Sequence, residues 1–445
     1  MTMQRKSDAE WTTLIDEICS GVWINPLTGK AFPPTAYDSI VFSESLEGRE
    51  ADLVQALGFT APFAVVSDQN THRALGERVA RALSRLGPVS EIILDHPHAD
   101  MASVRDLEAR LKPFSGIVAV GSGTLNDLTK FATFRNGQKY CVFATAGSMN
   151  GYTSSTASIT MDSGLKVSLP SQPPSGFFVD LQVSASAPAW LNAAGFGDCL
   201  CRSVAQIDWW MSHRTLGTTF RFEPFLIEIP DEVRLMEQAR GIASGDINAV
   251  GSLYRVLTLC GLGVNVVGTS HHGSMGEHQI SHYIDCFAGD RHPGTLHGQQ
   301  VGVATLTMAR VQGHFLSRDA APEVSATRID PADMARRMGS DIAAQCEVLY
   351  RKKAFDDAGA DRFNARIAAI WPELREECQR FAVPVETLQR ALAEAGGPTS
   401  AQSLGVPIEF YREAVCHAHE MRDRFSFADI ACDGGILHDL AENEV

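Results

Sequence analysis

The stretch that decides the fold is residues 117–127, with the sequence IVAVGSGTLND. Its first four residues are apolar and have the length of a buried strand, and glycines follow at positions 121 and 123. Small residues at a turn from strand to helix let the backbone approach a ligand closely, and the free N–H groups of the helix bind anions. The stretch therefore predicts an anion-binding turn of an α/β domain, although Asn126 occupies the third position of the usual G-x-G-x-x-G pattern.

The pattern on both sides of this stretch extends the prediction. Short apolar strands are expected at 64–66, 91–94, 117–120 and 140–145, with helices between them, and this alternation is typical of a doubly wound, mostly parallel sheet. From about residue 185 onward the apolar residues recur at helical spacing. We therefore expect an N-terminal α/β domain and an all-helical C-terminal domain. The predicted parts are an N-terminal extension at 1–35, expected to be a flexible arm with a short helix, the α/β domain at 36–184 and the helical domain at 185–445.

Composition narrows the class of protein. The net charge of -15 argues against binding to nucleic acid or to an anionic membrane surface. The N-terminus has no apolar core typical of a signal peptide, and no apolar run has the length of a membrane span. The ten cysteines are scattered without a Cys-x-x-Cys pair, which favours reduced thiols in the cytoplasm. Cys199 and Cys201 are interpreted as core residues rather than as soft-metal ligands.

Histidines cluster between positions 271 and 297, where six of the 14 in the chain occur. Neutral imidazole is the commonest protein ligand for transition metals. His278 and His282 are four residues apart and share one helix face, and His297 is far enough along the chain to come from a second element. The cluster predicts a metal site, with surface or capped histidines as the alternative interpretation.

Two aspartates are candidates for the metal site and for the nucleotide site. Asp198 opens a helix after Gly195-Phe-Gly197; it either caps that helix or completes a metal site with His278 and His297. Two imidazoles and one carboxylate leave a position for water or substrate, as in catalytic sites. Asp68 ends the first strand and either binds ribose hydroxyls or caps the next helix. The polar loop at 145–154 follows the fourth strand, at the ligand-binding edge of such a sheet.

Five motifs in order resemble the sn-glycerol-1-phosphate dehydrogenases, which belong to the superfamily of iron-containing alcohol dehydrogenases, glycerol dehydrogenases and dehydroquinate synthases. The resemblance covers roughly residues 37–440. The motifs are GSGTLND at 121–127, SMNGY at 148–152, GFGD at 195–198, GEHQISH at 276–282 and LHGQQVG at 296–302. The segment RDRFSFAD at 422–429 also looks like the closing segment of the family.

The resemblance implies a metal-dependent, NAD- or NADP-linked dehydrogenase. Its substrate would be sn-glycerol 1-phosphate or a related polyol phosphate, and its product dihydroxyacetone phosphate or the matching ketone. A cytoplasmic homodimer or larger homo-oligomer is expected, with zinc as the metal and nickel or iron as alternatives. The implied metal ligands and catalytic residues are Asp198, His278 and His297. The implied substrate-binding residues are Asn150, Asp198 and His282. The implied cofactor-binding residues are Asp68, Gly121, Ser122, Gly123, Thr124, Leu125, Thr145, Ala146, Gly147, Ser148 and Ser154.

The chain departs from the family pattern at two places. Asn150 stands where the family carries an aspartate that contacts substrate, and His271-His272 stands where the family usually has Arg-Pro. The first change removes a charge, and the second removes a natural bidentate partner for phosphate. The alternatives are a dehydroquinate-synthase-like cyclase, disfavoured by the missing Gly-Gly-Lys segment after residue 150, and a superfamily member with altered or lost chemistry.

Overall fold

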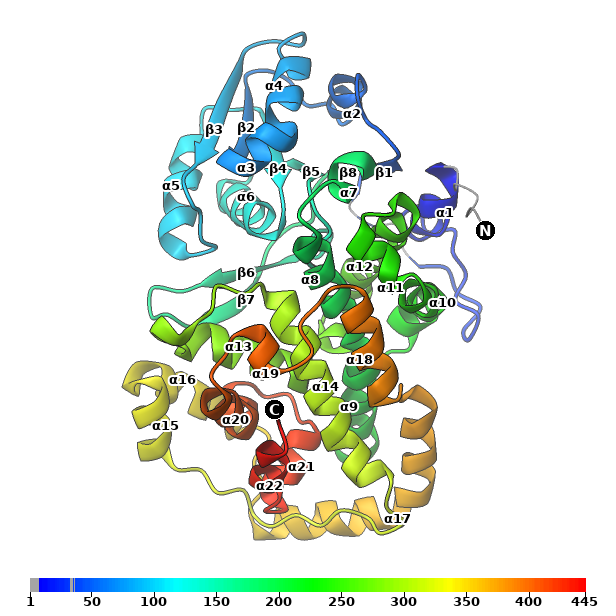
Figure 1. The fold of residues 1–445 in the computed structure, drawn as a ribbon, viewed down its shortest axis with the longest axis vertical. Coiled ribbons are helices and arrows are strands. Elements are labelled where there is room, and N and C mark those ends of the chain that lie inside the picture. Colours follow the sequence, from blue (N-terminus) through cyan, green and yellow to red (C-terminus); the bar gives the residue numbers. More distant parts are fainter. Residues whose placement is uncertain (1–7, 33–34, 36) are drawn as a thin grey trace. The chain divides into compact units, whose positions relative to one another are not determined.

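The computed structural model describes residues 8–32, 35 and 37–445, which form two compact units (Figure 1). The helices of residues 223–268 belong to the unit that holds the sheet. The sequence instead places the boundary after residue 184, and those domain limits stay a prediction. The first unit comprises the described residues up to Asp162, Lys166–Phe196 and Glu223–Gly268; the second comprises Ser163–Leu165, Gly197–Phe222 and Thr269–Val445.

The first unit is built on a six-stranded sheet in the order β1-β8-β5-β4-β2-β3, with every neighbouring pair parallel. This confirms the predicted doubly wound, parallel sheet. A separate antiparallel hairpin, β6-β7, was not anticipated from the sequence. The strands are β1 (Ser39–Ser43), β2 (Phe63–Asp68), β3 (Val89–Leu94), β4 (Gly116–Gly121), β5 (Cys141–Ala144), β6 (Thr156–Thr160), β7 (Lys166–Pro170) and β8 (Gly176–Asp180).

Helices cover both faces of this sheet, and alternate strand residues point to opposite faces. Val65 and Val118 pack in a core with helices α2 (Glu50–Ala56) and α4 (Glu77–Leu83). Ala64 and Ile117 pack in a second core with α5 (Met101–Leu111), α6 (Gly123–Asn136) and α12 (Ile247–Val267). Because both faces are covered, the strands contain nearly continuous apolar runs, which is why they are visible in the sequence.

The connections reverse direction between β2 and β4. From β2 the chain moves outward to β3, then returns past β2 to β4 and continues to β5 on the other side. Ligands of doubly wound sheets bind outside the carboxyl ends of the strands at such a reversal. Asp68 and Gly121 are the last residues of these two neighbouring strands.

The N-terminal segment contains the short helix that the sequence suggests. Helix α1 (Asp8–Cys19) buries Trp11, Ile15 and Ile18 in the same core as α12, whereas Val22 and Leu27 beyond it are exposed. The apolar residues of this helix recur every three to four positions and give it one face to bury. Residues 1–7, 33, 34 and 36 of the predicted extension lie outside the described residues.

Helix α12 bears on the expectation that the chain has no membrane span. By length and composition it is the one helix among the described residues that could cross a membrane. However, 78% of its apolar window is buried inside the fold, as in the core helix of a globular unit. It contributes Val250 and Tyr254 to the core beside the sheet.

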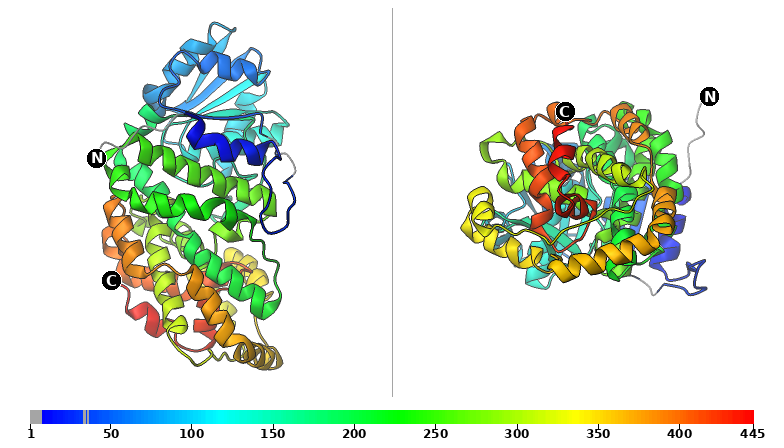
Figure 2. Two further views of the ribbon diagram at one scale, coloured as in Figure 1. Left: turned by 90° about the vertical axis from the view of Figure 1, so that its right-hand side faces the viewer. Right: turned by 90° about the horizontal axis from the view of Figure 1, so that it is seen from below.

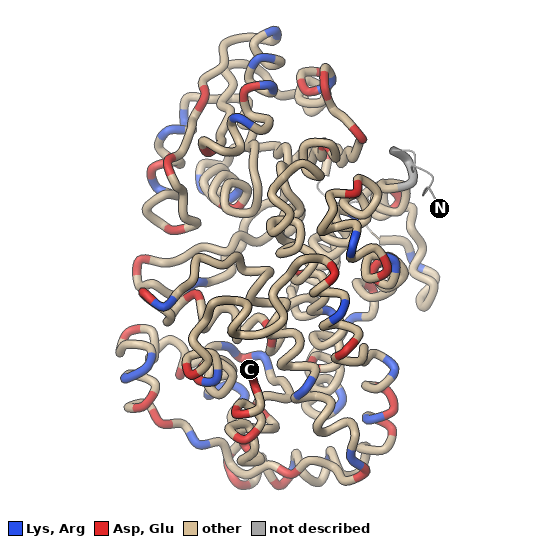
Figure 3. Tube along the Cα trace, in the orientation of Figure 1, with Lys and Arg blue, Asp and Glu red and all other residues tan. Residues whose placement is uncertain are grey.

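The second unit takes up the chain at Gly197–Phe222 and again at Thr269–Val445, and its regular structure in these two segments is helical (Figure 2). Acidic and basic residues are mixed along its helices (Figure 3). Gly339, whose φ is 77°, separates α15 from α16. The helices are α8 (Ala189–Leu200, which begins in the first unit), α9 (Arg202–Leu216), α13 (Gly276–Phe287), α14 (His297–Leu316), α15 (Pro331–Met338), α16 (Ser340–Tyr350), α17 (Asp357–Phe381), α18 (Val385–Glu394), α19 (Ala401–Leu404), α20 (Ile408–His417), α21 (Phe427–Asp433) and α22 (Leu437–Glu442).

Candidate metal and nucleotide sites

Three side chains predicted as metal ligands come together within the second unit. Asp198 lies near the end of α8, His278 in the first turns of α13 and His297 at the first residue of α14. One ligand atom from each lies within 4.8 Å of the others. His278 Nε2 is 3.5 Å from Asp198 Oδ1, and both side chains are buried. The structure thus assembles two imidazoles and one carboxylate from three separate helices.

Glycine brings two of these helices into contact. A Cβ at Gly197 would lie 2.5 Å from the carbonyl oxygen of Gly298 and 3.3 Å from Gly302 Cα. Only a residue without a side chain permits α8 and α14 to cross this closely. Asp198 follows Gly197 and His297 precedes Gly298, so the crossing places the carboxylate and the imidazole side by side.

Glu277 orients His278. Its Oε1 lies 2.9 Å from His278 Nδ1 and also accepts a hydrogen bond of 2.8 Å from the Met275 N–H. Since that oxygen is already an acceptor, His278 Nδ1 carries the proton, and Nε2 presents its lone pair toward Asp198. Burial raises the pKa of Glu277 to about 7. A carboxylate behind a ligating histidine fixes its tautomer and raises its basicity.

Ser281 orients His297 in the same way. Its hydroxyl donates to Gln300 Oε1 at 2.8 Å, while Gln300 Nε2 donates to Asp285 Oδ1 at 2.9 Å. A hydroxyl has one proton, so the 2.8 Å contact between Ser281 Oγ and His297 Nδ1 must use the proton of the imidazole. The Nε2 lone pair of His297 is therefore available as a ligand. Two neutral imidazoles and a carboxylate fit a divalent metal ion chemically.

The remaining histidines of the cluster have different surroundings. The ring of His282 lies 5.3 Å from that of His297, and Arg422 Nη2 lies 3.2 Å from its Nε2. His271 packs against Trp209, and burial lowers its pKa to about 3, so it is a neutral packing residue. His292 follows the short helix at Gly289–Arg291 and contacts Asp285 at 3.1 Å.

The predicted nucleotide-binding residues lie in the first unit, at the carboxyl edge of the sheet. Gly121 ends β4, and α6 begins two residues later with Gly123. Ser122 makes no side-chain cap to this helix, so its hydroxyl does not satisfy the first N–H groups of the helix. Residues 145–148 follow β5, the neighbouring strand. This is the arrangement in which dinucleotide phosphates are held, and Gly121, Ser122, Gly123, Thr124 and Leu125 stay the predicted cradle.

Asp68 and Ser154 already have intramolecular roles. Asp68 Oδ1 accepts hydrogen bonds of 2.8 Å from the N–H groups of Asn70 and Thr71, so the capping interpretation is correct. Its contact with ribose stays a prediction. Ser154 Oγ bonds the carbonyls of Gly151 and Thr156, each at 3.0 Å.

Asn150 lies in the turn after β5, in the first unit, and is partly buried. Lys130 stabilises the same turn, because its Nζ donates hydrogen bonds to the Gly151 carbonyl at 2.6 Å and to the Thr156 carbonyl at 3.0 Å. The backbone that carries Asn150 is therefore fixed by a buried amine.

Sequence reasoning missed the supporting residues Glu277, Ser281 and Arg422. Glu277 immediately precedes a predicted ligand, and a buried carboxylate next to a ligating histidine is a signal that the sequence does contain. Ser281 lies one turn along the same helix and carries no distinguishing pattern. Arg422 is remote in sequence, so only the fold reveals its contact with His282.

Known proteins resemble this chain over much of its length. The family model of iron-containing alcohol dehydrogenases matches residues 41–188. A glycerol-1-phosphate dehydrogenase of Bacillus velezensis is 26% identical over 424 residues, which covers 92% of this chain and 94% of that protein. The enzyme of that name from Bacillus subtilis is 29% identical, covering 81% and 82%. That from Pyrococcus furiosus is also 29% identical, covering 62% and 78%.

Solved structures share the fold. A probable glycerol dehydrogenase from Sinorhizobium meliloti aligns with a TM-score of 0.59 at 16% identity, covering 91% of this chain and 98% of that one. An NADH-dependent butanol dehydrogenase from Thermotoga maritima aligns with a TM-score of 0.60 at 12% identity, covering 92% and 98%. The sequence relatives and the five sequence motifs point to the same family. The matched family model and the sequence relatives support assignment of the chain to the iron-containing alcohol dehydrogenase superfamily, which includes the glycerol-1-phosphate dehydrogenases.

Proposed function

We propose that the chain is a metal-dependent, NAD(P)-linked dehydrogenase that interconverts sn-glycerol 1-phosphate, or a related polyol phosphate, and dihydroxyacetone phosphate or the matching ketone. The observation that carries the proposal is the group formed by Asp198, His278 and His297, whose ligand atoms lie within 4.8 Å of one another, with the protons of both imidazoles on Nδ1. Sequence relatives named glycerol-1-phosphate dehydrogenase support the substrate class.

The roles of the residues follow from their chemistry. Bound at the three ligands, a divalent metal would polarise the substrate oxygen, and a nicotinamide would exchange the hydride. Asp198 supplies the negative charge of the ligand set, and Glu277 and Ser281 keep the imidazoles in the ligating tautomer. We assign the phosphates of the nicotinamide cofactor to the turn at 121–125 and the loop at 145–148, with Asp68 on the ribose and Ser154 near the nicotinamide. We assign substrate contacts to Asn150, Asp198 and His282. Zinc is the proposed metal, since two imidazoles and one carboxylate suit it, and nickel and ferrous iron suit the same set.

The test uses the full chain loaded with zinc, nickel or ferrous iron. We expect oxidation of NADH or NADPH in the presence of dihydroxyacetone phosphate, followed by nicotinamide absorbance, and loss of this activity after chelation. Asp198→Ala, His278→Ala and His297→Ala should each lose bound metal, because a three-ligand site cannot spare one. The exposed His438 is the matched control, and His438→Ala should keep both metal and activity. Full metal occupancy in His297→Ala would refute the ligand set.

The alternative function is superfamily chemistry without net cofactor turnover, as in a dehydroquinate-synthase-like cyclase. Asn150 favours this alternative, because an amide cannot accept a substrate proton as the family aspartate can. Net consumption of nicotinamide cofactor distinguishes the two functions. An absence of any turnover would instead indicate a protein that binds metal and nucleotide without catalysis.

We also propose a cytoplasmic homodimer or larger homo-oligomer. All ten cysteines are free thiols in the structure, in keeping with a reducing compartment. Light scattering on the purified chain would give its assembly state.

A further inference from the structure

Arg422 is an arginine without a carboxylate partner inside the second unit. It follows the short helix at Ala418–Met421, and its Nη2 donates to His282 Nε2 at 3.2 Å. Among the described residues, no carboxylate lies within ion-pair distance of its guanidinium. Its side chain is only partly exposed, and burial lowers its pKa. A cation withdrawn from water without a partner is costly, so such a group implies an anion that is bound there in the working protein.

Two other shielded arginines of this unit are paired with carboxylates. Arg337 binds Asp333 and Glu420, and Arg310 binds Glu444. These pairs show how the fold compensates a shielded guanidinium elsewhere. Among the described residues, Arg422 has no such carboxylate, and neither has its neighbour Arg424.

A second arginine reinforces the positive charge at this place. Arg424 donates to the Ser274 carbonyl and to Ser270 Oγ at 2.9 Å. Burial and repulsion from Arg422 lower its pKa to about 9. Two neighbouring guanidinium groups favour a ligand group that carries more than one negative charge.

The unpaired guanidinium is adjacent to the candidate metal ligands. His282, which it contacts, lies one helical turn from His278, and the two rings are 6.3 Å apart. A small molecule that places an oxygen at the metal ligands can therefore place its anionic group beside His282. Arg422 would then supply the cation that the sequence lacks at His271-His272.

We propose that Arg422, together with His282, binds the phosphate group of the substrate and selects phosphorylated over neutral polyols. A guanidinium binds phosphate oxygens in bidentate fashion, and His282 Nε2 already lies at its edge. The assignment rests on the proposed function, which it deepens by naming the residue that recognises the phosphate. A carboxylate-bearing substrate offers related chemistry, so the test includes it.

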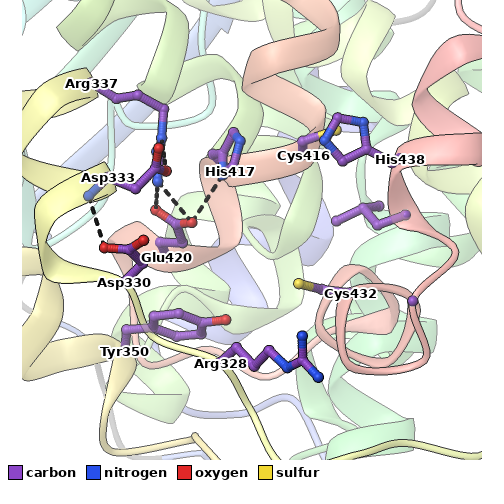
Figure 4. A pocket seen from close by; sticks show the side chains of 12 residues that line it. Arg328, Asp330, Asp333, Arg337, Tyr350, Cys416, His417, Glu420, Cys432 and His438 are labelled. Carbon is purple, nitrogen blue, oxygen red and sulfur yellow. Dashed lines mark hydrogen bonds and ion pairs between the residues drawn. The ribbon is translucent and has the colours of Figure 1, made fainter.

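A pocket elsewhere in the second unit provides the control. It has a volume of about 260 Å³, and Arg328 lines it with Arg337, Glu420 and Cys432 (Figure 4). Arg328 is also without a carboxylate partner among the described residues, but it is exposed. Asp330, Asp333 and Glu420 line the same pocket, and these three carboxylates disfavour an anion there. Arg328→Gln therefore removes the same charge from a place where we expect no phosphate.

The experiment measures the binding of inorganic phosphate to the full chain by calorimetry, both metal-loaded and after chelation. We expect the dissociation constant to rise about tenfold or more in Arg422→Gln, to recover in part in Arg422→Lys and to be unchanged in Arg328→Gln. Urea unfolding of each variant shows whether it is folded. Unchanged phosphate affinity in folded Arg422→Gln, or a loss in Arg328→Gln instead, would overturn the assignment. Tighter binding of malonate than of phosphate would overturn the choice of phosphate.

Turnover supplies a second readout. With sn-glycerol 1-phosphate, Arg422→Gln should raise KM at least tenfold with little change in kcat, and glycerol should be affected much less. If no polyol phosphate is turned over but phosphate binding still depends on Arg422, the proposed function fails and this inference stands. If turnover occurs with an unchanged KM in Arg422→Gln, the inference fails and the proposed function stands.

Discussion

At the scale of single residues, Ser281 decides which nitrogen His297 offers to a metal. Ser281→Ala removes the acceptor for the His297 Nδ1 proton and the donor to Gln300. We expect metal affinity to fall about 10–100-fold, as when the supporting partner of a ligating histidine is removed. Competition with a chromogenic chelator measures this affinity. Ser317→Ala, in an exposed position at the end of α14, is the matched control and should bind metal normally.

Asn150 is the residue at which the chain departs from its relatives by one charge. An amide can hold a substrate hydroxyl but cannot accept its proton. We expect weak activity of the unmodified chain with sn-glycerol 1-phosphate, and better activity with another phosphorylated or acidic polyol. Asn150→Asp should raise turnover of glycerol 1-phosphate about tenfold or more, which corresponds to about 1.4 kcal/mol in the barrier. Brisk turnover before the change, with none gained after it, would contradict this interpretation of Asn150.

At the scale of elements, the crossing of α8 and α14 at Gly197 holds the ligand set together. In Gly197→Ala the new methyl group would lie 2.5 Å from the Gly298 carbonyl oxygen. A backbone atom cannot relieve this contact by changing rotamer, as a side chain could. We expect a loss of about 1–3 kcal/mol in the free energy of unfolding, typical of overpacking, together with weaker metal binding.

The control for this change lies on α14 itself. Gly313 has nothing within 4 Å of its Cβ position, so Gly313→Ala should stabilise the helix by up to about 1 kcal/mol. Urea unfolding gives both free energies. Equal effects of the two substitutions would show that the close crossing does not constrain residue 197.

The turn between β4 and α6 is the second element with a testable role. In Gly123→Val, the added side chain would begin 2.7 Å from Met149 Sδ and would occupy the turn where we place the dinucleotide phosphates. We expect NADH binding to be abolished while the helices of the second unit stay folded. Fluorescence titration measures the binding and circular dichroism the folding, and unchanged NADH affinity would show that the phosphates bind elsewhere.

At the scale of the whole molecule, the predictable features are those with a local signature. Strands β2, β4 and β5 are buried apolar runs, β3 carries the apolar run at 92–94, and the helical spacing after residue 185 predicts the helices found there. Strand β1 was missed, because its partner is β8, more than a hundred residues away, and its five residues carry no distinct period. The hairpin β6-β7 was missed although polar and apolar residues alternate in both strands, because each strand is five residues long and carries only two apolar side chains.

Residues of the candidate site also differ in whether a local sequence pattern reveals them. Histidine spacing and the GFGD motif identify Asp198, His278 and His297, since each belongs to a compact motif. The contact between Arg422 and His282 depends on the path of the chain through seven further α-helices, and residue order alone does not encode it. At Asp68 the sequence pattern is visible but ambiguous, because a helix cap and a ribose ligand both call for an aspartate at the end of this strand.

The wide spacing of the three ligands along the chain has a consequence for the kinetics of folding. Asp198, His278 and His297 meet only after α8, α13 and α14 have packed, so an unfolded chain has no preformed chelate for zinc. An interaction absent from the transition state slows unfolding and leaves the folding rate unchanged. Stopped-flow measurements in urea should therefore show slower unfolding with zinc than with chelator, and equal refolding rates. Faster refolding with zinc would mean that the three helices meet early, before the rate-limiting step.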